Sequence, residues 1–283
     1  MFLINPYIYG GLTGYLVDDY NPRLAYSTQQ LSSSITNVIR LRRGSDNAES
    51  DFSASDLTDG TVSSWVGASE GNVVKLYNQG YGTPGLYDLA QSTAGLQPNI
   101  TDGAGTVLTL NGIPTIRFNS SSSQLLTVAD TYAYPTNNVS IFGVGAAQSG
   151  ATSGCLMGLH STSLSSLSMF IDSRTTPNRN LLINNGSTNF FADLSTARND
   201  TNLRLLSTFV DSSKNMSAFD NGATGGTNTY TGSYISNAIQ VGIRGSSSTP
   251  LDGYVSELIV FNEDKLSTRT DIEGNINDRF AIY

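Results

Sequence analysis

Apolar and polar residues alternate in short segments along most of this chain. Residues 38–43 and 73–77 place an apolar side chain at about every second position. Because successive side chains of a β-strand point to opposite faces, this spacing predicts strands with one buried face. Further short segments read as strands in the same way: 106–110, 113–118, 139–144, 167–171, 180–183, 203–210, 215–219, 238–243 and 254–261.

Tight turns separate several of these segments. Asn111-Gly112 lies between two strand candidates, and Asp220-Asn221-Gly222 follows another. Asn-Gly favours a two-residue hairpin turn because both positions tolerate positive φ. The Gly-rich stretch 222–230 is expected to be a polar loop. No repeat of fixed period occurs, so the pattern favours a sandwich over a solenoid or a propeller.

One helix is expected at the C-terminal end, over about residues 267–281. Ile272, Ile276 and Phe280 recur at helical spacing and form an apolar stripe. Ser267 is a good candidate for the N-cap. The stripe predicts that the helix packs against the sandwich.

The first 22 residues read as an extended N-terminal arm, and 23–283 as a single sandwich domain. Pro6 and Pro22 disfavour helix before them. The arm could fold back onto its own domain, insert into a partner subunit or be disordered. We take its apolar residues as candidates for anchoring the protein to a larger particle: Phe2, Ile4, Pro6, Tyr7 and Ile8. The N-terminus has no basic segment and no small-residue cleavage site, so no signal peptide is expected.

The composition supports strands and turns. Charged residues are 13% of the chain, and about a third of its residues are Ser, Thr or Asn. Helix surfaces usually carry Glu, Lys and Arg, whereas uncharged polar residues suit pleats and turns. The net charge of −8 argues against binding nucleic acid, and no apolar run is long enough for a membrane helix. A single cysteine excludes an internal disulfide framework.

Four parts of the chain together resemble a known family. They are 38–51 (VIRLRRGSDNAESD), 76–91 (LYNQGYGTPGLYDLAQ), 97–119 with its QPNI and NGIPTIRFN motifs, and 253–262 (GYVSELIVFN). In order and spacing they resemble the concanavalin A-like (laminin-G-like) jelly-roll domains of phage virion and appendage proteins. More distantly, the chain is similar to the catalytic domain of α-L-arabinofuranosidase B. The resemblance implies an all-β, antiparallel concanavalin A-like jelly-roll sandwich, with the arm and the C-terminal helix added to it. Position 78 is Asn where the family usually has Asp.

Carboxylates that could catalyse glycoside hydrolysis are few. Glu49 and Asp51 share one strand face, but Ala54 stands where a jelly-roll glucanase has its third acid. Glu257 lies on an apolar strand, where it is either a buried functional acid or the partner of an arginine. The lone His160 is expected in a surface loop. Cys155 is expected to be a small buried side chain.

Other polar groups have structural and binding interpretations. Arg40 and Arg42 are expected to pair with Ser45-Asp46 and hold the fold, with a binding site for an anionic ligand as the alternative. No cofactor is expected. Calcium is a weaker possibility, because hard cations bind loop oxygens. Candidate calcium donors are Asp18, Asp19, Asp211, Asp220 and Asn221. Loop tyrosines can pack loop bases or bind sugars: Tyr81, Tyr87, Tyr132, Tyr134, Tyr230 and Tyr234.

These observations predict a non-enzymatic bacteriophage structural protein, such as a head fibre, decoration or tail-appendage subunit. It would be made in the host cytoplasm and reside on the virion. Its arm would bind other virion proteins, its sandwich would attach to a host-surface glycan, and it would be a homo-oligomer, with no nucleic acid and no membrane insertion. Two alternatives remain open: a glycoside hydrolase of the concanavalin A-like class, or a secreted bacterial carbohydrate-binding or adhesion module.

Overall fold

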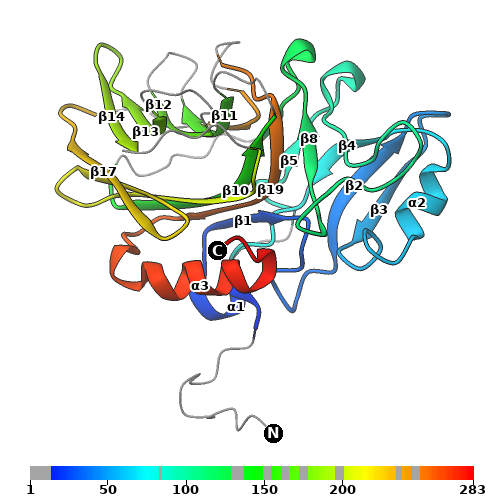
Figure 1. Cartoon of the computed structure of the whole chain (residues 1–283), viewed down its shortest axis with the longest axis horizontal. Coiled ribbons are helices and arrows are strands. Elements are labelled where there is room, and N and C mark those ends of the chain that lie inside the picture. Colours follow the sequence, from blue (N-terminus) through cyan, green and yellow to red (C-terminus); the bar gives the residue numbers. More distant parts are fainter. Residues whose placement is uncertain are drawn as a thin grey trace, which may run out of the picture.

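The protein is described here from a computed structural model. The described residues are 14–82, 85–128, 137–148, 154–160, 166–171, 178–194, 201–233, 238–243 and 249–283. Two large antiparallel sheets and a helical layer make up this part of the chain (Figure 1). The all-β jelly-roll class expected from the sequence is confirmed.

The first sheet is central, since it has one neighbour layer on each side. Among the described residues its order is β1 (Leu24–Ser27), β19 (Gly253–Phe261), β10 (Val139–Ala147), β15 (Arg204–Val210), β16 (Asn215–Asp220) and β17 (Ala223–Thr229), with β8 (Ile116–Phe118) also paired to β19. Every residue of β10 is buried. Ile141 packs into the core between the sheets, and Phe142 packs into the core under the helices. Burial on both faces explains why this segment is almost continuously apolar in the sequence.

The second sheet is longer and extends beyond the first. Its order is β14 (Asn189–Leu194), β13 (Asn178–Asn184), β12 (Ser166–Ile171), β11 (Gly154–His160), β18 (Ala238–Val241), β9 (Leu126–Val128), β5 (Leu89–Ala90), β4 (Gly71–Leu76), β2 (Asn37–Arg43) and β3 (Glu49–Ser53). The short helix α2 (Thr61–Val66) buries Val62 and Val66 at the β3 end of this sheet. Three single-turn helices are η1 (Ala94–Leu96), η2 (Ser120–Ser122) and η3 (Leu266–Thr268).

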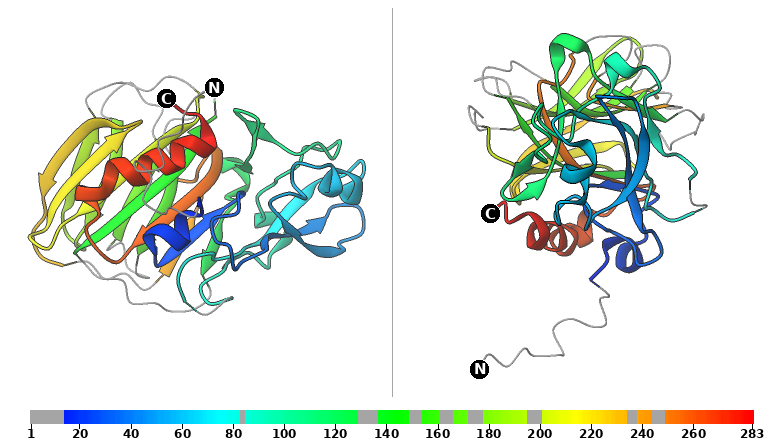
Figure 2. Two further views of the ribbon diagram at one scale, coloured as in Figure 1. Left: turned by 90° about the horizontal axis from the view of Figure 1, so that it is seen from below. Right: turned by 90° about the vertical axis from the view of Figure 1, so that its right-hand side faces the viewer.

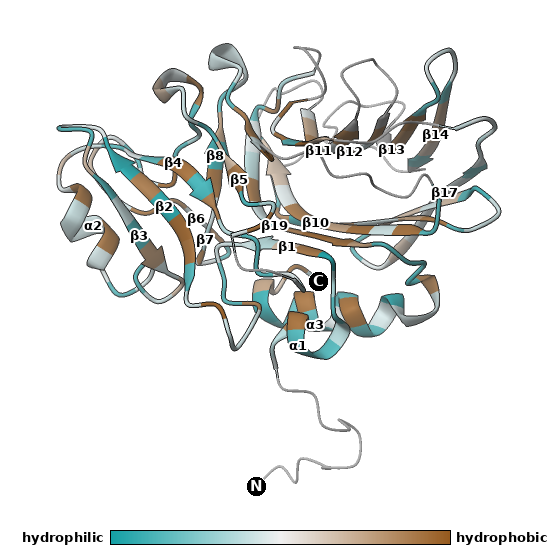
Figure 3. Cartoon of the chain, turned by 180° about the vertical axis from the view of Figure 1, so that it is seen from behind, coloured by the Kyte–Doolittle hydropathy of each residue, from teal (hydrophilic) through white to brown (hydrophobic). Residues whose placement is uncertain are grey.

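The predicted C-terminal helix is present as α3 (Arg269–Phe280). Its stripe of Ile272, Ile276 and Phe280 is fully buried against the central sheet, as the spacing predicts. Figure 2 shows α3 lying across the strands of that sheet, and Figure 3 shows hydrophobic residues along β10 and β19 between the layers. Ser267 is not the N-cap: η3 precedes the helix, and Thr268 occupies the cap without a side-chain hydrogen bond.

Residues 14–22, expected to be extended, contain the helix α1 (Leu16–Tyr20). Leu16 and Val17 are buried in the cluster that also holds the α3 stripe, and the backbone N–H of Val17 donates to the carbonyl of Leu31 over 2.9 Å. This segment is therefore part of the folded domain. The proposed anchor residues lie outside the described residues: Phe2, Ile4, Pro6, Tyr7 and Ile8.

The two predicted hairpins are present. Asn111 and Gly112 both have positive φ (51° and 78°) between β6 (Thr109–Leu110) and β7 (Ile113–Pro114). The second turn, at 221–222, leads into β17, so the loop expected over 222–230 is wrong. β17 is a polar edge strand, and a Cβ on its Gly226 would lie 2.1 Å from the carbonyl oxygen of Asp193 in β14. The glycines that suggested a loop allow this edge of one sheet to approach the other.

Candidate functional site

The loop that follows β4 is fixed to β1 by the buried side chain of Asn78. Its Oδ1 accepts hydrogen bonds from the backbone N–H groups of Ala25 and Gly80, each at 3.0 Å, and its Nδ2 donates to the carbonyl of Leu86 over 3.1 Å. An aspartate, which is usual at this position in the family that the sequence resembles, would lack the Nδ2 donor. Asparagine therefore ties three backbone segments together with one uncharged side chain.

Gln79 fixes the same loop on its other side. Its Oε1 accepts from the backbone N–H of Leu31 at 2.7 Å, and its Nε2 donates to the carbonyl of Gln29 at 2.9 Å. Gly80 then passes so close to β1 that a Cβ would lie 2.7 Å from the carbonyl oxygen of Arg23. Buried amides that use their hydrogen bonds in this way make the backbone rigid, because breaking them leaves unsatisfied groups.

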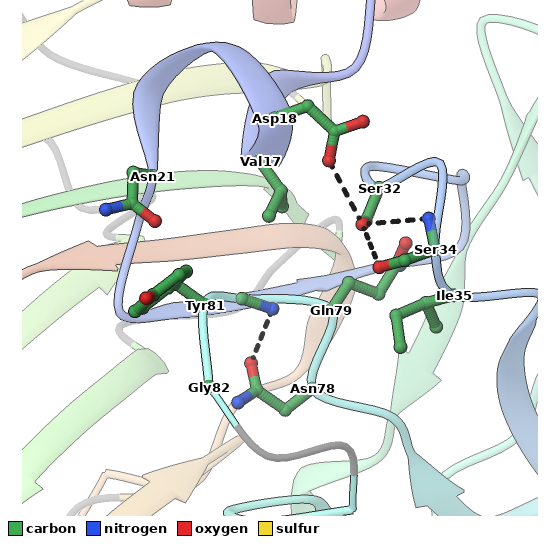
Figure 4. A pocket seen from close by; sticks show the side chains of 11 residues that line it. Val17, Asp18, Asn21, Ser32, Ser34, Ile35, Asn78, Gln79, Tyr81 and Gly82 are labelled. Atoms are coloured by element: carbon green, nitrogen blue, oxygen red, sulfur yellow. Dashed lines mark hydrogen bonds between the residues drawn. The ribbon is translucent and has the colours of Figure 1, made fainter.

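This rigid loop presents Tyr81 to solvent. Its side chain is 65% exposed, and its backbone N–H donates to the carbonyl of Pro22 over 2.8 Å. Tyr81 lies at the edge of a hollow of about 780 Å³ between the loop and α1 (Figure 4). We call this the Tyr81 hollow; its polar lining residues include Asp18, Asn21, Ser32, Ser34, Asn78 and Gln79.

A second, smaller hollow of about 230 Å³ shares Tyr81 and Asn21 with the first. Glu263 lines this smaller hollow, and its carboxylate lies 2.7 Å from the Nζ of Lys265. On the other side, hydrogen bonding from Ser33 lowers the pKa of Asp18 below its ordinary value, although desolvation opposes the shift. Tyr81 thus lines two hollows: the larger one carries the carboxylate of Asp18, and the smaller one carries Glu263 together with Arg23.

The other tyrosines proposed for sugar binding are not comparably placed. Tyr230 is 1% exposed and packs in the main core, and Tyr87 is partly buried against the same core. Tyr132, Tyr134 and Tyr234 lie outside the described residues. Tyr81 is therefore the member of this group that the described structure exposes strongly.

The acids considered for catalysis are in ion pairs. Asp51 receives two hydrogen bonds from Arg40, at 2.7 and 2.8 Å, and one from the hydroxyl of Tyr77 at 2.6 Å. Glu49 lies 4.0 Å from Arg40. The expected pairing of Arg40 with Asp46 is wrong, because the neighbouring strand offers Asp51 opposite Arg40 in register.

Arg43 is the partner of Asp46, through bonds of 2.9 and 2.7 Å, and Arg42 binds neither Ser45 nor Asp46. The side chain of Arg42 instead donates to Gln97 and Asn47. Asp46 thus holds its own turn, and Arg42 is directed toward a separate part of the sheet.

Glu257 is internal. It lies on the face of β19 that α3 covers, and it is 1% exposed. Its carboxylate accepts hydrogen bonds from Arg279 at 2.6 Å and from Ser27 at 2.9 Å. Desolvation raises its pKa, against the opposing effect of Arg279. It is the partner of an arginine that holds α3 to the sheet, and no hollow described above reaches it.

Cys155 is fully buried, as expected. His160 is the last residue of β11, so its assignment to a loop is wrong. A strand was not expected over 154–160, because the Gly-containing run GCLMGLH has no alternation.

The possible calcium donors do not converge. Asp18 accepts from Ser32, Asp211 accepts from Asn215, and Asp220 pairs with Arg204. Asp19 lies beside Asp18 in α1, and Asn221 accepts from the backbone of Leu205. Within the described ranges, no group of three or more His, Cys, Asp or Glu side chains could hold a metal ion. No helix in the same part of the chain is long and apolar enough to cross a membrane.

Comparison with known proteins supports the fold. No family model and no curated protein matches the sequence. Among solved structures, a GH54 α-L-arabinofuranosidase soaked with 4-nitrophenyl α-L-arabinofuranoside is 17% identical, with a TM-score of 0.63. An arabinofuranosidase complexed with arabinofuranosyl-α-1,2-xylobiose is 15% identical, with a TM-score of 0.65. Each match covers 93% of this chain and 63% of the other.

These matches correct one expectation. The sequence predicted a protein without enzymatic activity, because no complete set of catalytic carboxylates was found. The arabinofuranosidases that share this fold over 93% of the chain are enzymes. The absence of a third acid at position 54 is therefore not a ground for excluding a glycoside hydrolase. The match itself, at this identity, establishes the fold.

Proposed function

We propose that the protein is a carbohydrate-binding β-sandwich and that the Tyr81 hollow is its binding site. The observation that carries the proposal is an exposed aromatic ring on a rigid loop beside a polar hollow. An aromatic face packs against the C–H groups of a sugar ring, and polar neighbours bind its hydroxyls. The Tyr81 hollow is lined by the carboxylate of Asp18 and by uncharged residues, which favours a neutral sugar over an acidic one there, because like charges repel.

The ligands of the similar structures suggest which sugars to test first. One of these proteins was soaked with an arabinofuranoside and another holds an arabinofuranosyl-xylobiose. Arabinofuranosyl oligosaccharides, xylobiose and neutral hexose oligomers form a suitable panel. Neutral ligands also agree with the net charge of −8.

The test is calorimetric titration of this panel into the wild-type protein and into Y81A and Y81F. Y81A should weaken binding by roughly two- to tenfold, since a stacking contact of an aromatic ring contributes about 0.5–1.5 kcal/mol. Y81F should keep most of the affinity. Y283A is the matched control, because Tyr283 is also strongly exposed, at 55%, but at the C-terminus. Equal affinities of Y81A and wild type for every ligand bound would contradict the proposal.

Glycoside hydrolysis at this site is the second candidate, and it is favoured by the fold comparison. Hydrolysis uses one carboxylic acid to protonate the glycosidic oxygen and one carboxylate to activate water or attack the anomeric carbon. Asp18, whose pKa is lowered, suits the carboxylate role, and Glu263, on the other side of Tyr81, is the second carboxyl group to test. The assay is release of nitrophenol from 4-nitrophenyl α-L-arabinofuranoside and other aryl glycosides. D18N and E263Q should each abolish the release; activity that survives both substitutions excludes this assignment.

The setting on a phage particle is a further proposal, supported by the sequence resemblance. The arm, with Phe2, Ile4, Pro6, Tyr7 and Ile8, would dock the sandwich to other virion proteins. Because Leu16 and Val17 are buried, the informative truncation removes residues 1–13 and leaves α1 in place. The truncated protein should fold but fail to enter particles, measured by mass spectrometry of purified virions. Normal incorporation would contradict the docking role.

A further inference from the structure

We propose that a second pocket, on the outer side of the β2–β4 region, binds the adjacent hydroxyl groups of an uncharged sugar or polyol. This inference does not depend on the Tyr81 hollow, because the two sites share no lining residue. The pocket has a volume of about 430 Å³. We call it the amide pocket, after the Asn and Gln side chains that form its floor.

The floor of the amide pocket is a buried network whose hydrogen bonds are used within the protein. Gln97 accepts from the Nε of Arg42 at 2.7 Å and donates to the carbonyl of Gln91 at 2.8 Å. Gln124 donates to the carbonyl of Gln97 at 2.8 Å and to the Oδ1 of Asn99 at 3.2 Å. Gln97 is 2% exposed and Gln124 is 8% exposed. Such a floor is preorganised, so binding would cost little ordering of side chains.

The rim carries polar groups that the floor does not use. Arg42 uses Nε and one Nη on Gln97 and Asn47, and its second Nη makes no hydrogen bond within the described chain. The Oδ1 of Asn119 accepts hydrogen bonds from Ser121. The Nδ2 of Asn119 makes no hydrogen bond within the described residues. Glu70, an exposed residue, also lines the pocket. The residues that line this one cavity therefore include two with N–H groups to spare, Arg42 and Asn119, and one carboxylate, that of Glu70.

This arrangement matches the chemistry of vicinal hydroxyls. Each sugar hydroxyl can accept one hydrogen bond and donate another, so it needs donors and acceptors at the same site. Arg42 and Asn119 supply donors, and Glu70 accepts. A carboxylated ligand would gain from Arg42 but would face Glu70. A cation would face the opposite conflict, so a neutral polyhydroxyl ligand is the class that satisfies the whole rim.

The test is NMR titration with D-xylose, L-arabinose, D-galactose, D-glucose and D-mannose, with D-glucuronate as the charged probe. At least one neutral sugar should shift the side-chain amide signals of Gln97 and Gln124 at concentrations up to roughly 50 mM, above a millimolar dissociation constant. Only D-glucuronate shifting them, or no sugar shifting them, would overturn the proposal. Shifts are read at these two residues, so failure of binding at Tyr81 leaves the result interpretable.

The decisive variant is the double substitution E70Q/N119D. At position 70 it replaces a carboxylate with a neutral amide, and at position 119 it replaces an N–H donor with an acceptor. The net charge is unchanged, and residue 119 keeps the Oδ1 that caps η2. Loss of the Asn119 donor, and of the charge that strengthens the Glu70 acceptor, should together weaken the binding of the responding sugar by about tenfold. The matched control E49Q/N138D makes the same two exchanges at exposed positions elsewhere and should bind like wild type. Unchanged affinity in E70Q/N119D would overturn the proposal.

Discussion

Replacing Arg279 with methionine would leave a carboxylate buried between α3 and the central sheet. Arg279 donates to Glu257 at 2.6 Å, and Glu257 is 1% exposed. With the guanidinium removed, Ser27 is the remaining hydrogen-bond donor to that carboxylate in the described structure. Removing one partner of a buried ion pair typically costs about 3–5 kcal/mol. We expect R279M to lose roughly that much stability at pH 8.

The loss should depend on pH, and its sign follows from Glu257. Burial already raises the pKa of Glu257 above its ordinary value of 4.5, and the loss of Arg279 should raise it further. A folded state that holds its proton to higher pH than the unfolded state becomes less stable as pH rises between the two pKa values. R279M should therefore recover stability as the pH falls from 8 toward about 5, because the carboxyl becomes neutral.

The assay is urea unfolding of wild type, R279M, E257Q and E257Q/R279M at several pH values. The double variant removes both charges, so at pH 8 it should be more stable than R279M by at least about 1 kcal/mol. E257Q leaves Arg279 with access to water, because the arginine side chain is 16% exposed, and should be milder than R279M. A double variant no more stable than R279M, or a loss in R279M that does not change with pH, would refute the reasoning.

Three further substitutions test the packing and the loop. N78A should destabilise the protein by roughly 2–4 kcal/mol in urea unfolding, since it orphans two backbone N–H groups, and it should also weaken sugar binding at Tyr81. F280A should cost about 3–5 kcal/mol by the same measurement, because Phe280 is fully buried under the central sheet; a loss below about 1 kcal/mol would contradict that packing. G226A should cost roughly 1–3 kcal/mol, since its Cβ would collide with the backbone of Asp193; a neutral effect would mean that the two sheet edges lie further apart.

Much of the fold could be predicted because a strand with one buried face shows a local alternation of apolar and polar residues in the sequence. Residues 38–43 and the Asn111-Gly112 turn depend on neighbours in sequence, and both appear as expected. β17 was missed because its glycines are explained by the close approach of Asp193, a residue distant in sequence. α1 was missed because five residues are too few for a helical period to be recognised.

The candidate site was only partly predictable. The sequence suggested Tyr81 as one of several loop tyrosines, but exposure distinguishes it from Tyr230, and exposure depends on packing. The walls of the Tyr81 hollow come from α1, the residues after β1, and the loop after β4. No short motif joins these segments. The sequence left open whether Glu257 is a functional acid or the partner of an arginine. The structure shows that its partner is Arg279. Arg279 reaches Glu257 only because α3 packs against β19, and no local sequence pattern indicates that packing.

The two kinds of buried polar group in this protein should respond differently to pH. The α3 helix is held by carboxylates, Glu257 and Glu273, whose pKa values burial raises. The Tyr81 loop is held by Asn78 and Gln79, which do not titrate, and Asp18 beside it has a lowered pKa. Between pH 5 and 8 we therefore expect the free energy of unfolding to fall as pH rises while the backbone of the loop keeps its geometry. Hydrogen exchange of the Tyr81 amide, measured in the same samples, tests this: once the rates are corrected for intrinsic pH dependence, local protection should stay constant. Protection that falls together with global stability would mean that the loop opens only by global unfolding.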